Sequence, residues 1–207
     1  MSKERAKKIK VILFDVDGVL TDGTIWLQPA AGTGSHTEEA RQAKADAGGY
    51  GIASATVIEA KGFNAHDGSG ISLAKLGGLK VGVITKRISE TVALRARDLR
   101  LDFCYQGQAN KLNALADVCE KAGVEAAEVC YVGDDIIDLP VMRRVGLAVA
   151  VPNGRAMVKE EAHWITEQRG GEGAARDTIE YVLEAQGKLA DAISAYIHER
   201  IERKDAL

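Results

Sequence analysis

The sequence KVILFDVDGVLTDG, residues 10–23, decides the fold. Its apolar part, Val11 to Phe14, is short and ends abruptly at Asp15, which is typical of a strand buried on both faces of a parallel sheet. Five further segments share this pattern, the last two more weakly. They are residues 79–85, 127–134, 146–151, 102–106 and 163–166.

Helical patterns lie between these strands. Residues 111–122 repeat apolar side chains on one helical face and stop at Gly123, and Ser89 is a typical N-cap for a helix over residues 90–99. Strands that alternate with helices imply right-handed crossovers within one sheet. We therefore predict an α/β fold, a Rossmann-like parallel sheet with helices on both faces.

The segment after the first strand breaks this alternation. Residues 24–28 and 56–63 alternate apolar and polar side chains, which predicts the two arms of a β-hairpin flap. The sequence between the arms is rich in Ala and Gly and shows no apolar face. We expect it to form a loop, with at most a short helix over residues 38–47.

Length and composition restrict the class of protein. The 207 residues fit one domain over residues 1–207, with the insertion at about 24–62 and a C-terminal tail from about 167. A net charge of −3 offers no excess positive charge to bind nucleic acid or an anionic membrane. The first apolar run is too short for a signal peptide or a membrane span, so we expect a cytoplasmic protein. Cysteines at unpatterned spacing are expected to be reduced core residues: Cys104, Cys119 and Cys130.

Polar side chains follow the predicted strands at the points where they end. Ligands of open parallel sheets collect at the carboxyl edge, so these side chains are the candidate site. Neighbouring carboxylates there would repel one another unless they shared a divalent cation, and oxygen ligands without His or Cys favour Mg²⁺ over Zn²⁺. One hydroxyl and one ammonium group suit the oxygens of a phosphoryl group. The candidates are Asp15, Asp17, Thr85, Lys111, Asp134, Asp135 and Asp138.

Each of these pieces has an ordinary structural interpretation when it is taken alone. An Asp-x-Asp-Gly sequence is common in turns, and a lysine such as Lys111 usually lies on the solvated face of its helix. Residues 134–138 resemble a helix cap. The functional interpretation gains weight because all of the pieces fall at the same predicted edge, in one chain order.

Four of these segments resemble the four motifs of the haloacid dehalogenase superfamily, in order and spacing. They are DVDGVLTDG (15–23), VIT (83–85), the lysine of QGQANK (106–111) and GDDIID (133–138). The resemblance implies a phosphatase in which Asp15 is the covalent nucleophile. It also implies that Asp17 is the general acid and base.

The same resemblance implies roles for the remaining candidates. Mg²⁺ would be held by Asp15, by the backbone carbonyl of Asp17 and by Asp134. Asp138 would orient these ligands, and Asp135 would contribute to the same cluster. Thr85 and Lys111 would hold the phosphoryl oxygens, with Lys111 also offsetting the charge of the nucleophile.

No cap domain is expected over this site. Residues 85–111 leave room only for a helix and a strand, and residues 21–67 are too poor in apolar side chains for a core of their own. Finer matches resemble the 3-deoxy-D-manno-octulosonate 8-phosphate phosphatases, which are capless tetramers of lipopolysaccharide precursor synthesis. These matches are FNAHDGSGI (63–71), YQGQANKL (105–112), GDDIIDLPVM (133–142) and RGGEGAARD (169–177), followed by LEAQGKL (183–189).

This closer resemblance implies a homotetramer in which each site is completed by a neighbouring subunit and the substrate is a small sugar acid phosphate. Arg87 would pair with the carboxylate of the sugar acid. His66 and Asp67 would lie at the mouth of the site. The tail residues that would reach a neighbour's site are Arg169, Gly170 and Gly171.

The sequence departs from the family pattern at two places. Lys86 stands where the family usually has Gly, and the loop at about 28–55 is longer than the family's hairpin turn. Three other interpretations therefore stay open: a phosphatase for 2-keto-3-deoxynononate 9-phosphate, a phosphoprotein phosphatase, and a non-catalytic oligomerisation module of the same fold.

Overall fold

A six-stranded parallel sheet forms the centre of the computed structural model, which describes residues 2–29, 41–44, 47–53 and 57–202. The strand order is β11-β10-β9-β1-β6-β8, so β1 lies in the middle. This confirms the six predicted strands and the predicted fold class. The strands are β1 (Val11–Phe14), β6 (Lys80–Ile84), β8 (Phe103–Tyr105), β9 (Val129–Gly133), β10 (Leu147–Ala150) and β11 (Trp164–Ile165).

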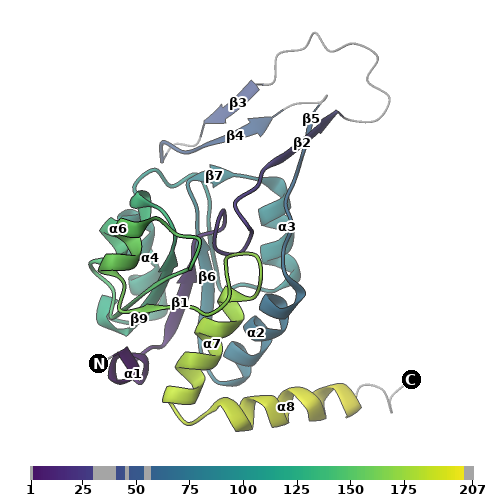
Figure 1. Ribbon diagram of the computed structural model, residues 1–207. Helices are drawn as coiled ribbons and strands as arrows, with labels where there is room; N and C mark the ends of the chain where they lie inside the picture. The colour runs from purple at the N-terminus through teal and green to yellow at the C-terminus, as the bar shows by residue number, and fades with distance from the viewer. Residues whose placement is uncertain (1, 30–40, 45–46, 54–56, 203–207) are drawn as a thin grey trace.

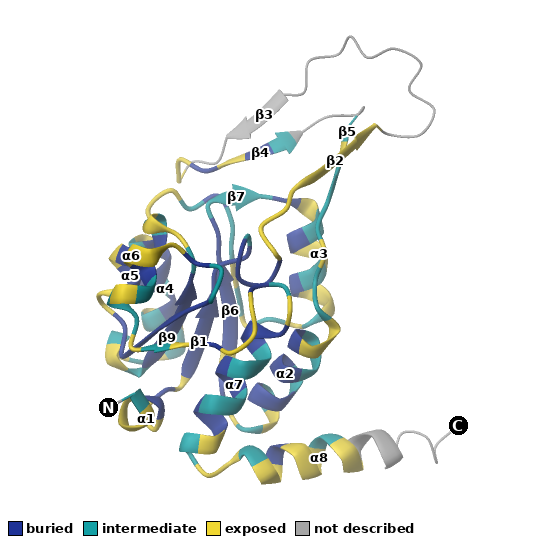
Figure 2. Ribbon diagram, in the orientation of Figure 1, coloured by how far each residue is buried: buried dark blue, intermediate teal, exposed yellow. Residues whose placement is uncertain are grey.

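Both faces of the sheet are buried, because strand β1 contributes side chains to a separate core on each face. Ile12 and Phe14 belong to the larger core, and Val11 and Leu13 belong to the smaller one. Figure 2 shows the central strands as the most continuously buried part of the molecule. The unbroken apolar run in the sequence reflects this burial on both sides.

Helices form a layer on each face of the sheet (Figure 1). On one face lie α2 (Ala65–Leu76), α3 (Glu90–Asp98) and α7 (Ala174–Ala185). On the other lie α4 (Lys111–Ala122), α5 (Leu139–Met142) and α6 (Ala156–Glu161). The end helices are α1 (Ser2–Ala6) and α8 (Leu189–Glu202), and two short 3-10 turns span Ala126–Glu128 and Ile136–Asp138.

Two small sheets stand above the carboxyl edge of the central sheet (Figure 1). The predicted hairpin is confirmed as β2 (Trp26–Pro29) paired antiparallel with β5 (Val57–Ala60). The expectation of a loop between its arms, with at most a short helix over residues 38–47, is wrong for part of the segment, because β3 (Arg41–Lys44) and β4 (Tyr50–Ala53) form a second antiparallel pair. Residues 38–40 and 45–46 lie outside the described residues. Strand β4 also pairs in parallel with β7 (Arg87–Ile88), a long-range partner that the local sequence could not indicate.

Two smaller expectations need correction. Ser89 stands at the N-cap of α3, but its side chain makes no capping hydrogen bond. Cys104 is exposed, whereas Cys130 is buried as expected and Cys119 is half-buried.

Among the described helices, none combines the length and the apolar composition needed to cross a lipid bilayer.

Candidate active site

Three carboxylates meet at the carboxyl edge of adjacent strands β1 and β9. Asp15, Asp134 and Asp138 each place an oxygen within 4.8 Å of the others. The loop after β1 passes so close to this cluster that a Cβ on Gly18 would lie 2.2 Å from Asp134 Oδ2, and Gly18 has a φ of +91°. Only glycine satisfies both conditions, which explains the glycine of the DVDG sequence.

Lys111 lies against this cluster at the first position of α4. Its ammonium group is 2.9 Å from Asp15 Oδ2 and 2.7 Å from Asp138 Oδ1, and it also donates to the Tyr131 hydroxyl at 3.0 Å. Burial disfavours its charge, but Asp15 and Asp138 outweigh burial and raise the pKa of Lys111. It therefore supplies one fixed positive charge to the carboxylate cluster.

That single cation does not neutralise the cluster. Burial, followed by repulsion from Asp15 and Asp138, raises the pKa of Asp134 to about 8. Burial also raises the pKa of Asp15 to about 7, against the opposing effect of Lys111. Asp134 Oδ1 is buried and has no hydrogen-bond partner among the described residues. Crowded carboxylates with an unpaired oxygen fit a divalent cation such as Mg²⁺, whose preferred ligands are oxygens.

Asp138 is held in the carboxylate cluster by hydrogen bonds to both of its oxygens. It is fully buried, and its Oδ1 atom accepts from Lys111 and from Tyr131, the latter at 2.7 Å. Its Oδ2 atom accepts from the backbone N–H groups of Asp134 at 3.0 Å and Asp135 at 3.2 Å. The Oδ2 atom therefore fixes the loop after β9, while the Oδ1 atom holds Lys111 and Tyr131. The exposed Asp135 caps the following turn through the N–H of Ile136, at 2.8 Å.

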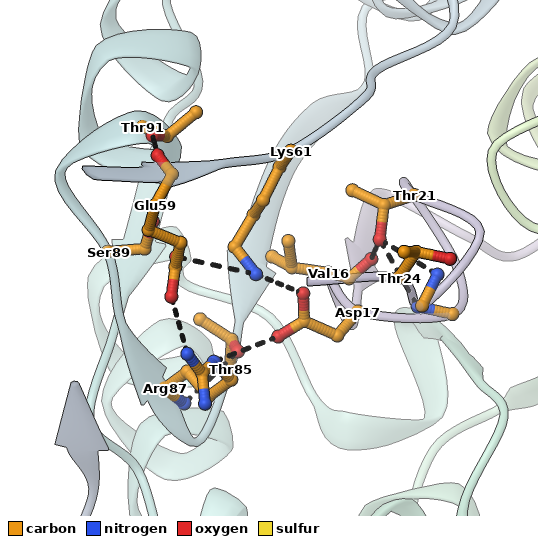
Figure 3. A network of polar contacts seen from close by, with 12 residues as sticks. Val16, Asp17, Thr21, Thr24, Glu59, Lys61, Thr85, Arg87, Ser89 and Thr91 are labelled. Atoms are coloured by element: carbon orange, nitrogen blue, oxygen red, sulfur yellow. Dashed lines mark hydrogen bonds and ion pairs between the residues drawn. The ribbon is translucent and has the colours of Figure 1, made fainter. Parts of the chain in front are cut away.

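Asp17 contacts two cations on other elements, Lys61 and Arg87 (Figure 3). Lys61, which follows β5 of the hairpin, contacts Asp17 Oδ1, and Arg87 of β7 places Nε 3.7 Å from Asp17 Oδ2. Glu59 pairs with both cations and completes the network. The Lys61 side chain is fully buried, and the two carboxylates offset the cost of burying its ammonium group. The hairpin thus holds the Asp17 side chain in place.

These residues surround a cavity of about 140 Å³ at the carboxyl edge. Thr85 lies in it at the end of β6 and is almost fully buried. Carboxylates and cations line it together, which gives it the chemistry to hold a phosphoryl group beside Asp15. Its lining residues are Asp15, Asp17, Tyr50, Thr85, Lys86, Arg87, Asp134, Asp135 and Ile137.

Known proteins resemble this chain over most of its length. A family model for haloacid dehalogenase-like hydrolases matches residues 88–176. The 3-deoxy-D-manno-octulosonate 8-phosphate phosphatase KdsC of Escherichia coli strain K12 is 38% identical over 188 residues, which cover 91% of this chain and 86% of the relative. The chain belongs to this phosphatase family.

Solved structures of the octulosonate 8-phosphate phosphatase family share the fold. The enzyme from Yersinia pestis superimposes with a TM-score of 0.75 at 33% identity, covering 91% of this chain and 88% of that one. The enzyme from Moraxella catarrhalis, solved with magnesium, phosphate and KDO, gives a TM-score of 0.75 at 32% identity, covering 94% and 97%. The predicted fold and family resemblance are both confirmed.

The Arg-Gly-Gly segment of this family member does not lie over its own cavity. Gly170 and Gly171 pack against the loop that follows β1. Gly171 donates to Val19 O at 3.1 Å, and a Cβ on Gly170 would lie 1.8 Å from Gly18 O. Arg169, the first residue of the segment, is exposed. The two glycines thus support the loop after β1 and leave Arg169 on the surface of the protein.

His66 and Asp67 are also not brought into the cavity. Both lie in the first turn of α2, and His66 is exposed in a separate surface depression. Asp67 is buried, accepts from the backbone N–H of Arg176 at 2.9 Å, and so joins the start of α2 to the start of α7. Burial raises the pKa of Asp67 to about 6. Its contacts are those of a residue that joins two helices.

Several residues of the site were not identified from the sequence, among them Tyr50 and Ile137, which line the cavity. Lys61 and Glu59 looked like ordinary polar positions of an alternating hairpin arm. Tyr131 looked like a core residue of β9, and it is one except for its hydroxyl. Asn153 accepts from the N–H of Gly170 at 2.7 Å and donates to Gly18 O at 2.8 Å. No local pattern marks the other four residues, because each has at least one partner on another element of the fold.

Proposed function

We propose that this protein hydrolyses 3-deoxy-D-manno-octulosonate 8-phosphate to the free sugar acid and phosphate, with Mg²⁺ as cofactor. The observation that carries the proposal is the meeting of Asp15, Asp134 and Lys111 at one edge of the sheet, with Lys111 Nζ 2.9 Å from Asp15. The E. coli relative is named for this substrate, and the M. catarrhalis structure contains magnesium, phosphate and KDO.

In the proposed reaction Asp15 attacks phosphorus, and the bond between phosphorus and the sugar oxygen breaks. Asp17 gives its proton to the leaving oxygen. A water molecule then attacks the phosphorus of the aspartyl-phosphate and gives a proton to Asp17, which frees Asp15 and phosphate. The contacts of Asp17 with Lys61 and Arg87 support this role by fixing its side chain beside the cavity.

Mg²⁺ would be held by Asp15, Asp134 and the backbone carbonyl of Asp17, and when bound it would offset the charge of the phosphoryl oxygens. Asp138 would orient this cluster together with Asp135, as its hydrogen bonds to the backbone of residues 134 and 135 support. Thr85 and Lys111 would hold the phosphoryl oxygens.

The rest of the substrate would contact residues outside the carboxylate cluster. Arg87 would pair with the carboxylate of the sugar acid, and its Nε atom has no hydrogen-bond partner among the described residues. The exposed position of Arg169 supports a role in a neighbouring subunit's site. We propose a cytoplasmic homotetramer acting in lipopolysaccharide precursor synthesis, as the family resemblance implies.

Phosphate release from a panel of esters tests the substrate assignment. With Mg²⁺, we expect kcat/KM for the octulosonate 8-phosphate to exceed that for 2-keto-3-deoxynononate 9-phosphate and for an aryl phosphate by at least about tenfold. EDTA should abolish turnover of all three. A preference for the nononate ester would overturn the substrate but leave a phosphatase, whereas no turnover of any ester would favour an oligomerisation module.

The melting temperature gives a test of the metal site that needs no turnover. The pKa values of Asp15 and Asp134, raised to about 7 and about 8, mean that the metal-free folded protein binds protons that the unfolded chain releases. This stabilisation is complete at low pH and is lost as the pH rises through 7 and 8. In EDTA the melting temperature should therefore fall between pH 6 and pH 8.5.

Mg²⁺ takes the place of those protons, so it should raise the melting temperature more at pH 8.5 than at pH 6, by about 5 °C or more at saturation. Asp134→Asn should remove most of this pH-dependent gain. Asp98→Asn, which changes an exposed acid on α3, should keep it. A gain that is equal at both pH values, or that survives in Asp134→Asn, would argue against the site.

A further inference from the structure

Strand β4 of the long insertion lies beside the active site of its own subunit. Tyr50 and Gly51 pair in parallel with Arg87 and Ile88 of β7, the short strand that begins two residues after Thr85. Figure 1 shows β4 directly above β7, at the carboxyl edge of the central sheet. The insertion therefore contributes to the same edge as the carboxylate cluster.

The sequence Gly48-Gly49-Tyr50-Gly51 is fitted to this position. The N–H of Gly49 donates to Gly107 O at 2.8 Å, and a Cβ on Gly49 would lie 2.2 Å from Gly107 Cα. A Cβ on Gly51 would lie 2.3 Å from Ile88 O. The backbone thus lies directly on the loops that follow β6 and β8, and side chains other than Tyr50 are excluded at the closest contacts.

Tyr50 lines the cavity that contains Asp15, Asp17 and Asp134. Its ring centroid is 5.6 Å from Lys86 Nζ and 5.4 Å from Arg87 Cζ, and 37% of the residue is exposed. Cations at this distance are attracted to the face of an aromatic ring. Tyr50 therefore holds two cationic side chains beside the cavity and still presents part of its own surface.

The position of Tyr50 in the cavity indicates what its surface would meet. The cavity of about 140 Å³ has room for a phosphoryl group beside Asp15. Tyr50, Lys86 and Arg87 are more exposed than the buried Asp15 and Thr85 of the same lining, so they form the rim past which the organic part of an ester would extend. An aromatic face beside two cations suits a hydroxylated carbon chain that carries a carboxylate.

We propose that β4 forms a wall of the active site within its own subunit, and that Tyr50 is a specificity-determining residue which contacts the sugar acid portion of the substrate. This inference rests on the proposed function. It gives Lys86, which stands where the family usually has glycine, a partner within the chain, the ring of Tyr50. It also gives the long insertion a function in a site without a cap domain.

The test compares two substrates in Tyr50→Ala, the full-length protein with Mg²⁺ being used throughout. Turnover of 3-deoxy-D-manno-octulosonate 8-phosphate should lose about tenfold or more in kcat/KM, chiefly through KM, because a contact outside the reacting group is removed. Turnover of acetyl phosphate should change by less than about threefold, because its short acyl group leaves the rim empty. Tyr50→Phe, which keeps the ring, should restore most of the loss.

The acetyl phosphate rate also reports whether the variant keeps an intact catalytic centre. Equal losses for both substrates, or no loss for either, would refute the assignment of β4 and Tyr50 to the wall of the active site. The proposed function would stay in place. If the wild-type protein hydrolysed acetyl phosphate but not the sugar acid phosphate, both the proposed substrate and the role of Tyr50 would be refuted. The two failures are therefore distinguishable in one set of assays.

Discussion

Asp15→Asn should lower kcat for the sugar acid phosphate by at least about 10⁴-fold, because the amide cannot form the aspartyl-phosphate. The fold should survive. Burial raises the pKa of Asp15 to about 7, which shows that its charge is unfavourable in the metal-free protein, and a neutral amide of the same shape removes that charge. Lys111 keeps Asp138 as a partner at 2.7 Å.

Phosphate release under saturating substrate and Mg²⁺ measures this loss, and the melting temperature in EDTA checks the fold. Asp22→Asn is a matched control in the same loop, since the Asp22 side chain is exposed and, among the described residues, accepts only from Thr24, whose N and Oγ1 atoms lie at 2.8 Å and 3.0 Å. It should keep near-wild-type turnover. Activity within about tenfold of wild type in Asp15→Asn would refute the nucleophile assignment.

Lys111→Met is expected to reduce both turnover and stability. Turnover should fall about 10³-fold, because a preorganised cation beside the phosphoryl oxygens is lost. Stability of the metal-free protein should fall by about 3 kcal/mol, because Asp15 and Asp138 lose the buried cation that lies within 2.9 Å of both. The stability loss should be larger at pH 8 than at pH 5.5, where Asp15 can take up a proton in the folded state.

Lys121→Met provides the comparison on the same helix. Lys121 pairs with Asp117 at 2.8 Å on the exposed side of α4, so both turnover and the denaturation midpoint should change little. Urea denaturation at the two pH values measures the stability terms. If Lys111→Met and Lys121→Met behaved alike, Lys111 would be an ordinary helix residue, which is what its position in the sequence alone suggests.

The central sheet and the carboxylate cluster were predictable because their signals are local. Each strand is an apolar run that ends in a polar residue, and the topology of parallel sheets brings those ends to one edge. The sequence alone therefore predicts that Asp15, Thr85 and Asp134 lie together. The cap of α4 was equally local, since Asn110 bonds to Leu112 N and Gly123 has a left-handed conformation.

The remaining parts of the site depended on contacts between distant segments. Lys61 meets Asp17 across 44 positions of the chain, and β4 pairs with β7 across a similar separation. Neither contact leaves a periodic signal in its own segment. An Ala- and Gly-rich stretch without an apolar face was therefore interpreted as a loop, although its glycines are where the backbone lies against other loops.

By itself the sequence determined the α/β fold, the family and the order of acidic and basic residues along the sheet edge, because burial and strand topology follow from local apolar runs. Only the tertiary structure decided that Lys61 holds Asp17, that Asp67 joins α2 to α7, and that Tyr50 faces the cavity. Those outcomes depend on how separate segments pack, and packing is a property of the folded chain that no single segment contains.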